Sequence, residues 1–144
     1  MSRTADIDLV FERAVTVEAV VGALAGERWS LQEPLGVSYM VNNDGLFNWQ
    51  SAPTDQVTQI LALVDSPDNI HYHVGVCIYS SAAKTGGQLL FHAGRSRCSF
   101  TPTIDRRGLS GASKLTDIAW YLNKLVRPLL AIGLTGYEAR DLAD

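Results

Sequence analysis

The sequence predicts an α+β fold: an antiparallel sheet of about five or six strands with two or three helices packed on one face. Apolar and polar residues alternate along several short segments, which is typical of strands with one buried face. Longer segments repeat apolar residues at helical spacing, and hairpin turns rather than regular crossovers connect the strands. The chain has 144 residues, of which 47% are hydrophobic, so we expect one domain spanning residues 1–144.

The first half alternates strands and helices. Residues 6–12 alternate strictly and predict a strand. Thr16 is expected to cap a helix that presents Val17, Val20, Val21 and Leu24 on one face and ends at Gly26. A second amphipathic helix is predicted after Pro53. Further strands are predicted over residues 29–32, 37–41 and 46–49, the last following a hairpin turn at Asn43-Asp44-Gly45.

The second half contains the most regular patterns. Residues 70–79 predict a strand, residues 88 to about 100 predict another, and residues 101–113 are expected to be irregular. A long helix is expected from about Ser113, with Trp120 and Tyr121 off its apolar stripe. Pro128 should kink this helix or end it one turn early, and Gly133 should close it. Residues 137–144 are expected as a short strand or a tail.

Composition excludes several classes of protein. The sequence contains no apolar run near the roughly 20 residues of a membrane-spanning helix. The N-terminal residues lack the apolar core of a signal peptide, which predicts a cytoplasmic protein. Two cysteines, Cys77 and Cys98, do not make a disulfide framework and are expected as free thiols. A net charge of −3 disfavours nucleic-acid binding through bulk electrostatics.

Charge is unevenly distributed along the chain. Residues 1–72 contain ten acidic and three basic side chains, whereas residues 73–144 contain nine basic and five acidic ones. The two halves can neutralise each other by packing together. Alternatively, one face of the fold is acidic and attracts a basic partner.

The three histidines form the first candidate site. If Leu89, Phe91 and Ala93 face the core, His92 shares a sheet face with His71 and His73. Three imidazoles on one face could hold a divalent ion, and an open coordination position would allow hydrolysis. However, no carboxylate is placed locally to orient them, so the simpler interpretation is the polar side of a half-exposed sheet. No metal or other cofactor is therefore predicted.

Arginines and one tryptophan form the second candidate site. Arg95 and Arg97, with Arg106 and Arg107, are the only local basic cluster and could bind phosphates or carboxylates. The alternative is that they form salt bridges with the acidic first half. Trp49 lies beside the predicted hairpin and is a candidate interface anchor. No sequence motif of a nucleotide-binding protein or of a serine hydrolase is satisfied at the required spacing.

In its size, acidic balance and lack of a catalytic signature, the whole chain resembles the small cytoplasmic immunity proteins encoded beside bacterial toxins. The resemblance implies a non-catalytic domain whose partner is a cognate toxin or effector, neutralised by binding. The acidic first half is then the candidate surface for a basic toxin domain. The alternative is a small enzyme or ligand-binding protein that uses the histidine or arginine cluster. Trp49, His71, His73, His92, Arg95 and Arg97 are the predicted contact residues for a partner or ligand.

Overall fold

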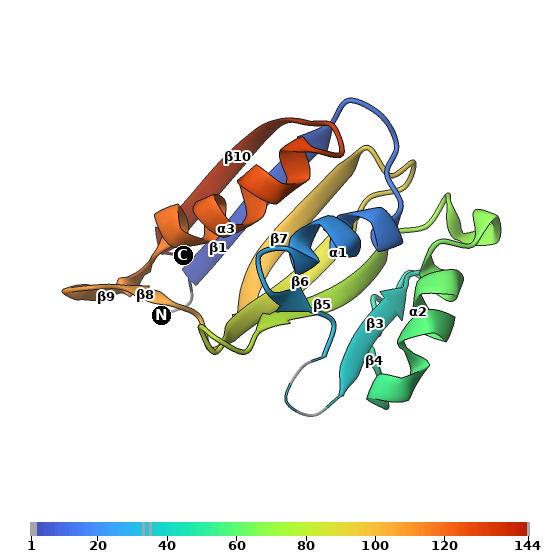
Figure 1. Cartoon of the computed structure of the whole chain (residues 1–144), viewed down its shortest axis with the longest axis horizontal. Helices are drawn as coiled ribbons and strands as arrows, with labels where there is room; N and C mark the ends of the chain where they lie inside the picture. The colour runs from blue at the N-terminus through green and yellow to red at the C-terminus, as the bar shows by residue number, and fades with distance from the viewer. Residues whose placement is uncertain (1–2, 33, 35, 144) are drawn as a thin grey trace.

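The computed structural model describes residues 3–32, 34 and 36–143 and has an α+β fold with three α-helices (Figure 1). Its main sheet has eight antiparallel strands in the order β10–β1–β7–β6–β5–β3–β4, with β2 also pairing with β5. This sheet is larger than the five or six strands predicted. Its strands are β1 (Arg3–Phe11), β2 (Trp29–Ser30), β3 (Val37–Val41), β4 (Gln50–Ala52), β5 (Val74–Ser80), β6 (Thr85–Phe91), β7 (Arg97–Ile104) and β10 (Leu134–Ala143). A separate hairpin pairs β8 (Gly108–Leu109) with β9 (Ala112–Thr116).

Turns divide segments that the sequence predicted as single strands. The segment 88–100 is a hairpin between β6 and β7, because Gly94 and Arg95 adopt positive φ angles of 84° and 65°. The strand expected from Ile70 begins at Val74, after a 3-10 turn, η2 (Pro67–Asn69). The return strand expected at 46–49 is a loop, and β4 follows it. Residues 101–104, expected as irregular, extend β7.

The first two helices are joined at their ends. Helix α1 (Val17–Ala25) begins as predicted, because the Thr16 side chain accepts a hydrogen bond from the Ala19 N–H. Asp65, which ends α2 (Val57–Val64), accepts bonds from the Val17 N–H at 2.7 Å and the Glu18 N–H at 3.0 Å. A short 3-10 turn, η1 (Thr54–Gln56), leads into α2. The Asp65 carboxylate therefore satisfies free amides of α1 and attaches it to α2.

The third helix, α3 (Ile118–Leu130), starts later than predicted because β9 occupies residues 112–116 and the Asp117 side chain provides the cap. Pro128 lies inside the helix, which ends two residues later. A proline has no N–H, so the carbonyl of Lys124, four residues earlier, lacks its helical donor. The indole N–H of Trp29 donates to this carbonyl at 3.2 Å and attaches α3 to β2.

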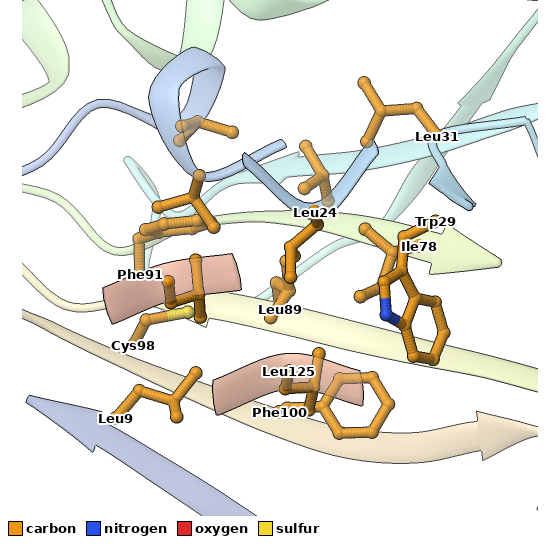
Figure 2. Packing of buried hydrophobic residues seen from close by; sticks show 14 of the residues in the cluster. Leu9, Leu24, Trp29, Leu31, Ile78, Leu89, Phe91, Cys98, Phe100 and Leu125 are labelled. Carbon is orange, nitrogen blue, oxygen red and sulfur yellow. The ribbon is translucent and has the colours of Figure 1, made fainter. Parts of the chain in front are cut away.

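Buried residues of all three helices pack against one face of the sheet (Figures 1 and 2). Leu24 of α1 and Leu125 of α3 lie among Leu89, Phe91 and Phe100 of the sheet. Tyr121, expected off the apolar stripe of α3, is fully buried, and its hydroxyl lies 2.6 Å from Thr85 Oγ1. The helices therefore cover only one side of the sheet, and the opposite side is available to position polar residues.

Candidate functional site

The sheet face opposite the helices, which we call the open face, is lined by one row of residues across five strands. Strand pairing places these residues side by side in register. Opposed residues of antiparallel strands point to the same face, so the row shares one surface. The row consists of Asp8 of β1, Ser99 of β7, Leu90 of β6, Gly75 of β5 and Met40 of β3.

A polar network lies at one end of this row. The Ser99 hydroxyl donates to Asp8 Oδ1 at 2.6 Å and lies 3.2 Å from His92 Nε2. Because the serine proton is directed to Asp8, His92 Nε2 is the donor in its contact with Ser99. The Arg140 guanidinium contacts Asp8 at 2.7 Å, Asp6 at 2.8 Å and Glu138 at 2.9 Å. One arginine therefore holds three carboxylates on β1 and β10.

The charges of this network follow from its contacts. Partial burial by itself would raise the pKa of Asp8, but hydrogen bonds from Ser99 and Arg140 and the positive charge of Arg140 lower it below its ordinary value. Burial, together with the neighbouring charges of His73 and Arg97, lowers the pKa of His92, against the opposing effect of Asp8. At neutral pH the network therefore contains an ionised Asp8 and a neutral His92.

This geometry does not activate Ser99 as a nucleophile. In a Ser–His–Asp triad the imidazole accepts the serine proton and the carboxylate binds the other imidazole nitrogen. Here Asp8 contacts Ser99 itself, and His92 donates toward the serine oxygen. The Ser99 hydroxyl therefore joins Asp8 and His92 by hydrogen bonds.

The structure brings together only two of the three histidines. The rings of His73 and His92 lie 5.0 Å apart, and the Phe47 ring lies 6.0 Å from His73. His92 shares the open face as predicted, because Leu89 and Phe91 face the core. His71 lies exposed in the turn before β5 and is not part of this stack. In the described ranges, no three His, Cys, Asp or Glu side chains are arranged to hold a metal ion.

Trp49 is half-buried against the open face. A Cβ atom at Gly75 would lie 2.6 Å from the Trp49 ring, so only glycine permits this close approach. The indole therefore packs on the bare backbone of β5, beside the row described above. Its position fixes the loop 42–49 over the sheet, and the residues that precede it in the loop are the more exposed ones.

Arg95 and Arg97 do not form one exposed basic cluster, contrary to the prediction. Arg95 is 3% exposed, and its guanidinium donates to the carbonyls of Tyr72, His92 and Asn69 at 2.7, 3.0 and 2.7 Å. Burial lowers the pKa of Arg95, and the charge of Asp65 opposes that shift. Arg95 therefore has a structural role. Arg97 is exposed on β7 and remains a candidate contact residue.

The edge of the sheet formed by β3 and β4 exposes acidic and large apolar side chains. The sequence contains neither Lys nor Arg from residue 29 to residue 83. Residues 37–73, which we call the acidic end, comprise β3, the loop 42–49, β4, α2 and the turns around α2 (Figure 1). Its exposed carboxylates are Asp44, Asp55 and Asp68, and its large exposed apolar side chains are Leu46, Phe47, Leu63 and Tyr72.

Sequence reasoning identified Trp49 but missed Leu46 and Phe47, which are 69% and 47% exposed. Phe47 adopts a φ of 50°, a conformation that disfavours a bulky residue by about 1–2 kcal/mol. Asn42 and Asp44 hold this loop by accepting bonds from the Phe47 and Leu46 N–H groups, each at 2.9 Å. In the sequence, the signal for these two exposed residues was their position as consecutive apolar residues directly after the Asn-Asp-Gly turn.

A concave site lies elsewhere, between the end of α1, the β5–β6 turn and the start of α3. This cavity of about 500 Å³ is lined by Arg107 of the predicted arginine cluster, but by none of the three histidines and neither Arg95 nor Arg97. Its charged side chains are partly occupied by contacts within the protein: Lys124 pairs with Glu27 at 3.5 Å, and Arg107 stacks over the Trp120 ring. The cleft that the ligand-binding alternative requires is therefore separate from the histidines.

No protein-family model, curated protein or solved structure matches this chain. Within the described residues, none of the helices has the length and apolar character needed to cross a membrane.

Proposed function

We propose that the chain is a non-catalytic protein-binding domain, and specifically an immunity protein that binds and neutralises a cognate bacterial toxin through its acidic end. The observation that carries this proposal is the exposed surface of the segment 37–73, which contains carboxylates and large apolar side chains and no Lys or Arg. Such a surface complements a basic, partly apolar face of a partner protein.

The charge distribution supports a basic partner. Asp44, Asp55 and Asp68 are exposed, and the sequence supplies no Lys or Arg within this segment to neutralise them. A region of one sign attracts an oppositely charged partner and raises the association rate, most strongly at low ionic strength. Many toxin domains that act on nucleic acid need a basic active site, which an acidic surface of this kind would cover.

The exposed apolar residues supply candidate anchors. Leu46 and Phe47 extend from a loop that Asn42 and Asp44 hold with hydrogen bonds, and Trp49 fixes the same loop to the sheet. Rigid aromatic side chains lose little entropy on binding and are typical of binding hot spots, and the neighbouring Leu46 adds apolar area that a partner can bury. The strained backbone of Phe47 is consistent with a side chain held for recognition.

The experiment that tests the proposal is a rescue assay. The protein encoded immediately beside this chain is expressed in a bacterial host, with and without this chain, and survivors are counted. We expect that the neighbouring protein kills the host and that this chain restores survival. If the neighbouring protein is not toxic, or if this chain leaves its toxicity unchanged, the proposal fails.

A matched pair of variants then tests the surface. Leu46→Ser at the acidic end and Leu130→Ser at the end of α3 remove leucines that are 69% and 58% exposed. We expect Leu46→Ser, alone or with Phe47→Ser, to weaken rescue and partner affinity by about tenfold, as loss of an anchor residue does. Leu130→Ser should rescue like the natural chain. Equal effects of the two single variants would place the interface elsewhere.

The alternative is a small enzyme or ligand-binding protein that uses the histidine or the arginine cluster. It is favoured by the close approach of His73 and His92, whose ring centroids lie 5.0 Å apart, since neighbouring imidazoles can bind one metal ion. Zinc titration by calorimetry distinguishes this alternative. One equivalent of tight binding that disappears in the His73→Ala/His92→Ala variant would favour it, whereas equal titrations of both proteins would remove it.

A further inference from the structure

Strand β10 is the outer strand of the sheet at the edge opposite the acidic end. In the described part of the chain it pairs with β1 on one side and with no strand on the other. It is ten residues long and contains neither proline nor lysine, the residues that commonly protect an exposed edge. We propose that two copies of this chain pair antiparallel through the outer edges of β10, about a two-fold axis at Ala139.

Charge selects this register. When Ala139 lies opposite Ala139 of the second copy, Glu138 of each copy lies opposite Arg140 of the other. Both side chains point to the open face, since Arg140 is in register with Asp6 and Glu138 with Asp8. Shifting the axis to Glu138 or to Arg140 would instead place like charges opposite each other, which is unfavourable. Of these three registers, only that of Ala139 places opposite charges across from each other.

The length of the regular strand supports the same axis. The pairing of β1 with β10 is irregular between Val10 and Phe11, so β10 is regular only from Gly136 onward. The regular strand then continues to Ala143. In the Ala139 register, residues 136–142 of one copy pair with residues 142–136 of the other, so seven of these eight residues gain a partner strand along their free edge.

An exposed leucine fits a bare position on the second copy. Leu142 is 63% exposed on the open face, and the Ala139 register places it opposite Gly136 of the other copy. A Cβ atom at Gly136 would meet nothing within 4 Å, so the backbone there is uncovered. In the dimer, Leu142 of each copy would cover Gly136 of the other copy. These two contacts bury apolar area that the single chain leaves in water.

The paired chains would form one continuous sheet with the helices of both copies on the same side, because opposed residues share a face. Strands β10 and β4 are at opposite ends of the strand order. The two acidic ends would therefore lie at the far ends of the joined sheet. This inference is independent of the proposed function.

Sedimentation equilibrium of the full chain over a micromolar concentration series tests the assembly. We expect a species of twice the chain mass of 15.7 kDa. Glu138→Arg should raise the dimer dissociation constant by about tenfold or more, because it replaces two attractive pairs with two repulsive ones. Asp55→Arg, the same charge change at an exposed residue of the acidic end, should leave dimerisation intact. A natural chain that stays monomeric, or equal effects of both variants, would overturn the proposal.

Cross-linking tests the register and does not depend on the charge variants. In the Ala139→Cys variant the two introduced thiols would face each other across the axis, with Cα atoms about 4.5–5.5 Å apart, within disulfide range. In Tyr137→Cys the equivalent thiols would be offset by about 13 Å along the strands. We expect mild oxidation to give a disulfide-linked dimer of the first variant only. Equal cross-linking of both, or none of either, contradicts this register.

Discussion

Arg95 should contribute much more to stability than Arg97, although both belong to the same basic segment. The guanidinium of Arg95 makes three hydrogen bonds with the carbonyls of Asn69, Tyr72 and His92. These bonds join the β6–β7 turn to the turn that leads into β5. Arg97 is exposed, and no hydrogen bond or ion pair of its side chain occurs within the described residues.

The stability lost on replacing Arg95 depends on which carbonyls would lose their only hydrogen-bond donor. Asn69 O also accepts the Tyr72 N–H, and His92 O also accepts the Arg95 N–H, each at 3.0 Å. Tyr72 O has no other donor in the described part of the chain. An Arg95→Met variant keeps much of the aliphatic packing but loses these bonds. We expect its free energy of unfolding to fall by about 2–4 kcal/mol, since one carbonyl is left unsatisfied and charge-assisted bonds are lost.

Urea unfolding followed by circular dichroism measures this difference. The midpoint of Arg95→Met should fall while the m-value stays unchanged, because the folded state remains compact. Arg97→Met is the matched control and should change stability by no more than about 0.5 kcal/mol, as exposed substitutions usually do. Equal losses in the two variants, or a loss below about 1 kcal/mol for Arg95→Met, would refute the structural role assigned to Arg95.

Two other predictions concern the helix junction and pH. Asp65→Ala should lower the free energy of unfolding by about 1–2 kcal/mol, because two amides of α1 lose the carboxylate that caps them. Asp68→Ala is the control and should lower it by less, and thermal unfolding compares the two variants. The pKa of His92 is lowered in the folded state, so folding disfavours protonation of this imidazole. The stability contribution of the neutral His92 is therefore complete above the ordinary imidazole pKa of 6.5. It is lost as the pH drops through that value toward the lower pKa of the folded state. Urea midpoints on either side of pH 6.5 should show a smaller loss for His92→Gln than for the natural chain.

The sequence by itself determined the fold class and the buried face of most strands. Alternation places Ile7 and Leu9 on the core face of β1, and this pattern is local, because successive side chains of a strand point to opposite faces. The cap at Thr16 was equally local, since it depends on a residue three positions away. The sequence also predicted that His92 lies on the open face, because a strand register that buries Leu89 and Phe91 leaves no other choice.

Tertiary structure decided which polar residues are free to function. Arg95 looked like Arg97 in the sequence, and only the turn geometry buries one and exposes the other. The network of Asp8, Ser99 and Arg140 joins residues up to 132 positions apart, which no local pattern encodes. Likewise, α3 ends at Leu130, three residues before Gly133, and the carbonyl that Pro128 leaves without a helical donor is bound by Trp29, 95 positions away. Burial and long-range hydrogen bonds depend on which strands become neighbours, and that pairing is a property of the whole chain.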